Sequence, residues 1–121
     1  MRWKGVVGLA ATLGLVSGPA MAEARWLVCK YNDTRRGQAQ TFYMVFDDLR
    51  NLAALFDGGN LIEGTSTSIN FQALRTRFPP FIITYNRNDG ALAVTPTEGG
   101  LGGILSGECR RIPTPPNAPR L

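Results

Sequence analysis

The chain of 121 residues contains no histidine and only two cysteines. Without histidine it has no Ser-His-Asp or Cys-His nucleophile, lacks the commonest general base, and cannot ligate a metal through imidazole. The two cysteines, Cys29 and Cys109, stand far apart, which excludes a Cys-x-x-Cys redox pair and a four-cysteine zinc site. We therefore expect no catalytic residue, no metal site and no cofactor.

Carboxylates remain the one source of acid–base chemistry. Asp47, Asp48 and the nearby Asp57 could bind calcium or form an acid pair. However, neighbouring residues of a strand point to opposite faces, and no Asp-x-Asp-x-Asp-Gly spacing is present. Turn formation and helix capping explain these aspartates better. A carboxylate-based hydrolase stays a remote alternative, which requires two acidic groups among these three, Glu63 and Glu98 to converge in a cleft.

The sequence lacks an apolar run long enough to cross a bilayer. The run at residues 6–16 spans about 11 residues, whereas a membrane helix needs about 20. Arg2 and Lys4 precede it, and a small-x-small pattern, Ala-Met-Ala at residues 20–22, follows it, as in a cleavable signal peptide. We expect residues 1–22 to be a signal helix that is removed on export. The protein is then periplasmic or secreted, with no stable membrane insertion after cleavage.

The mature chain also lacks a strong excess of one charge. The full sequence has 13 basic and 9 acidic residues, but two of the basic residues leave with the signal peptide, so 11 against 9 give a net charge of +2. The remaining arginines are scattered along the chain. We expect no nucleic-acid partner, because such binding depends on a clustered basic surface.

Short runs of β-branched and aromatic residues alternate with turn residues along the mature chain. We expect strands at the following runs: 24–31, 40–46, 69–74, 81–85, 91–95 and 104–112. Residues 86–90 (NRNDG) predict a hairpin turn. Residues 64–68 are expected to form a polar loop, and residues 75–80 to interrupt the sheet, because their two prolines cannot donate ladder hydrogen bonds. The proline-rich residues 113–121 are expected to be a disordered tail.

Residues 48–56 are compatible with two structures. Asp48 could cap a short helix with Leu49, Leu52 and Phe56 on one stripe. Alternatively, residues 47–51 form a turn and the following residues a strand. The leucines and alanines favour the helix, whereas the strong strand just before this segment and its short length favour the hairpin. We favour the hairpin.

Together these patterns predict an all-β fold, a small antiparallel meander that forms a curled sheet or barrel, in a single domain over residues 23–112. A disulfide between Cys29 in the first strand and Cys109 in the last would close it; two free buried thiols are the alternative. Such a bond adds about 4 to 5 kcal/mol in the chain-entropy model. First and last strands that meet would also protect the edges of the sheet.

One segment, residues 75–81, has the character of a binding surface. It combines the cations Arg75 and Arg77 with the aromatic rings of Phe78 and Phe81 around a rigid diproline. These four residues are our candidate binding surface. The alternative is a connection between strands whose phenylalanines fill the core.

The hairpin sequence YNRNDGAL at residues 85–92, followed by SGEC at residues 106–109, resembles a pattern in small exported proteobacterial proteins. In those proteins an early strand carries the other cysteine, and no function is assigned to them. The resemblance therefore supports the fold and implies no activity.

A looser similarity is to the periplasmic inhibitors of lysozyme, which are short, exported, disulfide-closed β-barrels with a cysteine in the first strand, here Cys29. Their Ser-Gly-x-x-Tyr loop enters the lysozyme cleft, and Ser106-Gly107 matches only its first two residues. We expect a non-enzymatic exported protein that binds an unknown partner, with an envelope protein as one candidate, or that serves envelope maintenance. An inhibitor of a cell-wall hydrolase is the alternative.

Overall fold

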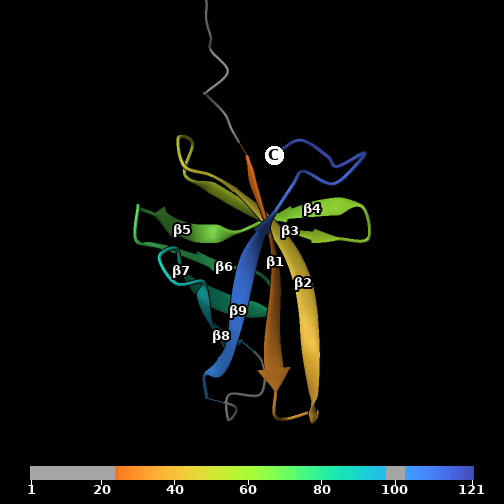
Figure 1. Ribbon diagram of the computed structural model, residues 1–121, viewed down its shortest axis with the longest axis vertical. Coiled ribbons are helices and arrows are strands. Elements are labelled where there is room, and N and C mark those ends of the chain that lie inside the picture. The colour runs from red at the N-terminus through yellow and green to blue at the C-terminus, as the bar shows by residue number, and fades with distance from the viewer. Residues whose placement is uncertain (1–23, 98–102) are drawn as a thin grey trace, which may run out of the picture.

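The computed structural model describes residues 24–97 and 103–121, and within them the chain forms one antiparallel sheet of nine strands in the order β4-β3-β2-β1-β9-β8-β7-β6-β5 (Figure 1). The strands are β1 Arg25–Asp33, β2 Gln38–Asp47, β3 Leu52–Asp57, β4 Asn60–Glu63, β5 Thr65–Ile69, β6 Ala73–Arg77, β7 Phe81–Asn86, β8 Ala91–Pro96 and β9 Leu105–Ile112. Every pairing is antiparallel, which confirms the predicted all-β meander. The predicted signal peptide, residues 1–22, lies outside the described residues.

The segment after β2 is a hairpin, as favoured from the sequence, and not a helix. The carboxylate of Asp47 accepts hydrogen bonds from the backbone N–H groups of Leu49 (2.9 Å) and Arg50 (3.3 Å). Asn51 then takes a left-handed conformation (φ 54°), which asparagine tolerates better than most residues. Because the Asp47 side chain satisfies the turn, the chain reverses directly into β3.

The prediction was wrong over residues 60–77. Residues 64–68, predicted as a loop, mostly belong to β5, and the predicted strand 69–74 is broken by a turn in which Asn70 Oδ1 accepts the N–H groups of Gln72 and Ala73. Residues up to Arg77 belong to β6, and β4 was not predicted at all. The reason is exposure: β5 (TSTSI) has no buried side chain, and β4 spans only four residues, so neither carries a readable apolar pattern.

The sheet curls into a nearly closed barrel because its two edge strands, β4 and β5, are joined by the single residue Gly64. A Cβ atom on Gly64 would overlap Oγ1 of buried Thr76, so only glycine fits at this crossing. The side chain of Asn51 links the β2–β3 turn to β5, since it donates to the carbonyl of Thr67 (2.9 Å) and accepts from the N–H of Ile69 (3.0 Å). The two edges are thus drawn together.

The first and last strands pair in the middle of the sheet and carry the predicted disulfide. Cys29 and Cys109 stand directly opposite each other in the β1–β9 ladder, and their sulfur atoms are bonded. Two positions along, Gly107 faces Tyr31, and a Cβ there would overlap the Tyr31 backbone. The glycine therefore lets β1 and β9 approach closely beside Tyr31, which packs against the apolar cluster of the barrel.

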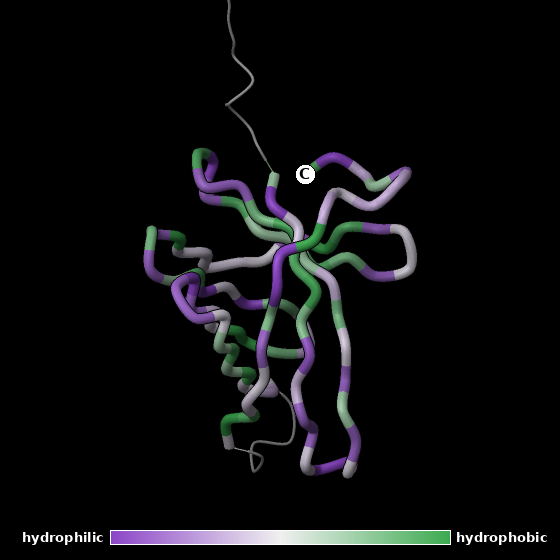
Figure 2. The backbone as a smooth tube through the Cα atoms, viewed as in Figure 1, coloured by the Kyte–Doolittle hydropathy of each residue, from purple (hydrophilic) through white to green (hydrophobic). Residues whose placement is uncertain are grey.

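Alternating side chains of the strands fill the barrel with apolar groups, and a second, smaller cluster lies on the outer face around Trp26, Val45 and Ala54. Ala118 and Leu121 of the C-terminal segment pack against this outer cluster, and Arg50 Nη2 donates to the main-chain oxygen of Leu121 (2.8 Å). Figure 2 shows hydrophilic residues, by contrast, along the lower part of the β1–β2 hairpin. That residues 113–121 are disordered in solution stays a prediction.

Candidate functional site

The two ends of the barrel differ in construction. We call one the Arg87 end; it holds the start of β1 and the β2–β3, β5–β6 and β7–β8 turns. The other, the Phe81 end, holds the β1–β2, β3–β4 and β6–β7 turns. In Figure 1 the Arg87 end lies towards the upper left and the β1–β2 turn of the Phe81 end at the bottom.

A cleft opens at the Phe81 end. It consists of two adjoining depressions, of about 400 and 200 Å³, that share Tyr31, Gln40, Pro80 and Phe81 as lining residues. The larger depression continues along β2 and β3, and the smaller one reaches the charged β1–β2 turn. Side chains from four separate parts of the chain, within residues 31–43, 55–58, 80–81 and 94–96, therefore meet around one hollow.

The floor of this cleft is aromatic. The ring of Phe81 lies 5.1 Å from that of Phe42 and 6.0 Å from that of Tyr31, and Tyr31 and Phe42 are 6.1 Å apart. Phe78 packs edge-on against Phe81 (6.2 Å) from the core side and holds it in place. The Tyr31 hydroxyl is neutral at pH 7, like that of any tyrosine, and can donate a hydrogen bond; burial, with a smaller contribution from the nearby carboxylate of Asp33, raises its pKa further.

One wall of the cleft is charged. Oδ1 of Asp33 accepts hydrogen bonds from the backbone N–H (3.1 Å) and Nε (3.0 Å) of Arg35, and Oδ2 accepts from its Nη2 (3.1 Å). The hydrogen bonds from the Arg35 side chain lower the pKa of Asp33 despite its burial. Arg36 lies 3.7 Å from the same carboxylate and is 66% exposed. Two guanidinium groups against one carboxylate leave this wall with a net positive charge.

The opposite wall combines polar and apolar side chains, and its charged residue is Asp57. Tyr43, 42% exposed, stands directly across from Phe56 in the β2–β3 ladder, and both line the larger depression with Gln40 and Asp57. Within residues 24–97 and 103–121, the structure records no hydrogen bond or ion pair from the side chains of Gln40, Tyr43 and Asp57. The polar atoms of these side chains can therefore form hydrogen bonds to a ligand.

The structure does not bring the four predicted binding residues onto one surface. Arg75 and Arg77 are exposed on β6, whereas Phe78 is fully buried and Phe81 is 8% exposed. Alternation along the strand explains the split, because the arginines and Phe78 point to opposite faces of the sheet. Phe81 lines the cleft and Phe78 supports it. Ligand binding by Arg75 and Arg77 stays a prediction.

Sequence reasoning missed the other lining residues, although one signal was present. Residues 40–46 are apolar on both faces, and the structure shows why: Phe42 faces the interior, while Tyr43 faces outward beside the cleft. Tyr31 and Pro80 gave no local signal, because their proximity depends on how the barrel closes.

The acidic residues are dispersed. Asp47 pairs with Arg50 (2.9 Å) and Asp48 with Arg87 (2.9 Å) at one end, and Asp57 lies at the other. Burial alone would raise the pKa of Asp47, but the hydrogen bonds from the Arg50 side chain and from two backbone N–H groups outweigh it and lower the pKa. Nowhere in the described chain do three acidic or cysteine side chains gather as a metal site would require. Glu98 lies outside the described residues.

Comparison of the chain with models of protein families, with curated proteins and with solved structures finds no match. The Ser106-Gly107 pair, which resembles the start of the lysozyme-inhibitor loop, lies inside β9, where it pairs with β8 and, at Gly107, with β1. Across the part of the chain that the structure describes, no helix has the length and apolarity to span a bilayer.

Proposed function

We propose that this protein is an exported, non-enzymatic binding protein, periplasmic or secreted, and that its ligand occupies the cleft at the Phe81 end. Two features support export. The N-terminal segment has the pattern of a signal peptide, and the Cys29–Cys109 disulfide is typical of proteins in oxidising compartments.

The observation that carries the proposal is the composition of the cleft. An aromatic floor of Tyr31, Phe42 and Phe81 lies beside side chains that have no partner among the described residues, those of Gln40 and Tyr43. Binding sites for small molecules combine apolar surface with a few polar groups in this way. The ligand that fits has a flat apolar face and carries hydroxyl or amide groups.

Binding without catalysis agrees with the chemistry of the chain. It contains no histidine, and Asp33, Asp47 and Asp48 are each held by arginine. The pKa values of Asp33 and Asp47 are lowered, which makes these two carboxylates poor general acids. The cleft carries one further carboxylate, that of Asp57.

The test is a capture experiment from periplasmic extract with the mature protein and two matched variants. Gln40→Ala with Tyr43→Ser changes the cleft, whereas Arg75→Ala with Arg77→Ala removes the two exposed cations of β6. We expect the wild type and the β6 variant to recover the same ligand and the cleft variant to lose it. Recovery of nothing by the wild type at any salt concentration contradicts the proposal, as does equal recovery by the cleft variant.

The second candidate is an inhibitor of a cell-wall hydrolase. Its support is the small disulfide-closed barrel, an architecture that lysozyme inhibitors share with this chain. It predicts nanomolar to micromolar inhibition of at least one lysozyme, measured as clearance of a cell-wall suspension. Unchanged activity across a panel of lysozymes would dismiss it and leave the cleft proposal standing.

A further inference from the structure

The two depressions of the cleft differ in charge. Among the described residues that line the larger depression, the charged one is Asp57, whereas Asp33, Arg35 and Arg36 line the smaller depression. Within residues 24–97 and 103–121, the Asp57 carboxylate has no hydrogen bond or ion pair. Exposed carboxylates are common on protein surfaces, so this charge carries no conclusion until its surroundings are considered.

Strand geometry places Asp57 beside the aromatic floor of the cleft. Asp57 ends β3, and Leu55, two positions earlier, belongs to the interior cluster, so both side chains lie on the inner face of the strand. Tyr43 pairs with Phe56 in the β2–β3 ladder, and the next pair in this register is Phe42 with Asp57. The carboxylate therefore lies at the mouth of the barrel, next to the strand position that supplies one of the floor rings.

The three floor rings form a close triangle. The ring centroids of Tyr31, Phe42 and Phe81 are 5.1 to 6.1 Å apart, and the ring planes are inclined to one another by 44° to 87°. All three residues line the larger depression. A cation is attracted to the face of an aromatic ring within about 6 Å of its centre. Because the centroids are so close together, one charge above this triangle is within range of all three rings.

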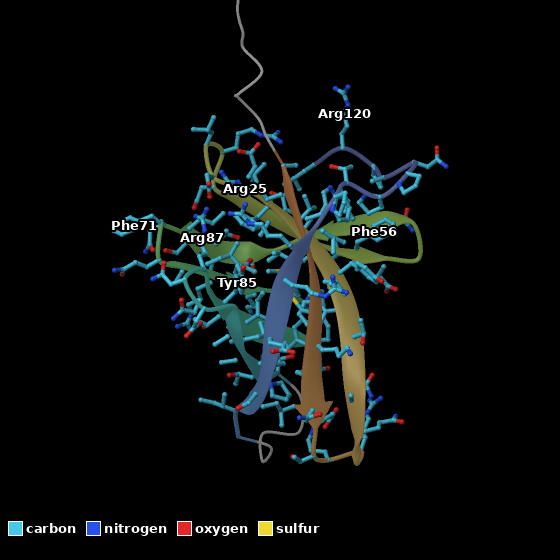
Figure 3. All side chains as sticks on the ribbon, in the orientation of Figure 1. Arg25, Phe56, Phe71, Tyr85, Arg87 and Arg120 are labelled. Atoms are coloured by element: carbon cyan, nitrogen blue, oxygen red, sulfur yellow. A yellow bond between two sulfur atoms is a disulfide. The ribbon has the colours of Figure 1, made fainter. Side chains whose placement is uncertain are left out.

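The rim of the larger depression adds two further aromatic side chains, those of Tyr43 and Phe56. Trp26 packs edge-on against Phe56, with 5.4 Å between the ring centroids, and so supports it from the outer cluster. Figure 3 shows Phe56 on the β3–β4 hairpin, with Arg87 on the other side of the view. Aromatic rings around a carboxylate, with no cation among the described lining residues, match the needs of a positively charged ligand.

We propose that the larger depression binds an organic ammonium ion, with its nitrogen between Asp57 and the three floor rings and its apolar body along β2 and β3. This inference rests on the proposed function, because it names the ligand class of the same cleft. The carboxylate and the rings both attract a positive charge. Arg35 and Arg36 in the smaller depression repel a second one, so the ligand carries one cation rather than two.

The test is isothermal titration calorimetry of the mature protein with phenylpropylamine, phenylpropanol and phenylpropanoate. These probes share one apolar body and end in an ammonium, a hydroxyl and a carboxylate group. We expect the amine to bind at least about tenfold more tightly than the alcohol, because the rings and the carboxylate both act on its charge. The affinity of the amine should fall as salt is added, whereas that of the alcohol should not.

A matched pair of variants assigns the effect to Asp57. Asp57→Asn keeps the shape of the side chain and removes its charge, so the amine should bind at least about threefold more weakly while the alcohol binds as before. Asp89→Asn is the control, because Asp89 is also exposed on a hairpin turn but lies at the Arg87 end. Asp89 Oδ1 accepts the N–H of Ala91 (2.9 Å), a bond that asparagine can also form. We expect no change in this variant.

Proton NMR of the bound amine gives a second readout. The methylene protons beside its nitrogen should shift upfield, because they lie over aromatic rings. Absence of amine binding, equal affinities for the three probes, an unchanged affinity in Asp57→Asn, or an equal loss in Asp89→Asn would each overturn the inference. If the wild type still captures a ligand that Gln40→Ala with Tyr43→Ser loses, the proposed function stands and only the ligand class is wrong; if capture fails as well, both are wrong.

Discussion

The two ends of this barrel contain the same kinds of side chain, aspartate, arginine and aromatic rings. At one end, which we call bridged, an arginine connects separate turns, whereas the other end is open. At the Arg87 end, the ion pair joins residues 39 positions apart, Asp48 and Arg87, and so ties separate turns together. At the Phe81 end, Asp33 bonds Arg35 two positions away. An ion pair between near neighbours in sequence stabilises its own turn but does not connect that turn to another. The space between the turns therefore stays available to a ligand.

The turns themselves follow one rule at both ends. Asp33 and Asp47 each end a strand, each accepts backbone N–H groups of the following turn, and each binds an arginine two or three residues on. The difference between the ends therefore does not come from the hairpins. It comes from the side chains between the turns. At one end Arg87 bonds two turns together, whereas at the other end aromatic rings line an open cleft.

Loss of the disulfide should have the largest effect, because β1 and β9 contribute to both ends. In Cys29→Ala with Cys109→Ala we expect the free energy of unfolding to fall by about 2 to 5 kcal/mol, since the unfolded chain regains its entropy. Urea unfolding at pH 7 measures it. A loss below about 1 kcal/mol would mean that β1–β9 pairing holds the barrel without the bond.

The bridged end should be more sensitive to loss of its arginine than the open end. Arg87→Met removes charged hydrogen bonds to Asp48 and Asn70 and should cost about 2 kcal/mol. Arg36→Met removes an exposed pair and should cost less than about 0.5 kcal/mol. Urea unfolding of the two variants, measured under the same conditions, gives both losses in the free energy of unfolding. Equal losses would show that arginine stabilises the two ends to the same extent.

Acid should weaken both ends, because the pKa values of Asp33 and Asp47 are lowered in the folded protein. Their stabilising contribution is complete above the unfolded pKa of about 3.9 and is lost as the pH falls through the folded pKa values. Unfolding measured from pH 7 to pH 2 should therefore show declining stability below about pH 4. Asp33→Asn and Asp47→Asn should each make this decline shallower, and an unchanged slope in both would assign it to other carboxylates.

A modest effect is expected from the C-terminal segment, whose Leu121 reaches Arg50 at the bridged end. Residues 113–121 pack against Trp26, so their deletion exposes this side chain, the only tryptophan within residues 23–121. We expect a shift of its fluorescence to longer wavelength and a loss on the order of 1 kcal/mol. Identical spectra with and without the segment would support the disorder predicted from its prolines.

Much of the fold could be predicted from local pattern. The turn 86–90, the hairpin after Asp47 and the pairing of Cys29 with Cys109 all agree with the structure. The failures share a cause, because β4 and β5 are short, and β5 is mostly exposed, so that their side chains do not show which face is buried. Their place in the sheet depends on partners far along the chain.

The cleft was the least predictable feature. Residues 75–81 predicted a surface of two cations and two rings, but strand alternation puts Phe78 and the arginines on opposite faces. Tyr31, Phe42 and Phe81 come from three strands, β1, β2 and β7. Nothing in any one of these strands indicates that its ring will meet the other two.

Residue types and their spacing were enough to establish the strand-and-turn character of the chain, the partner of each cysteine and the absence of histidine chemistry, because each depends on neighbours in sequence or on composition. Which end is bridged and which is open depended on the folded barrel. Only its closure through Gly64 and the reach of Arg87 bring distant side chains together. Contacts of that kind arise from the stagger of paired strands, which no local stretch of residues encodes.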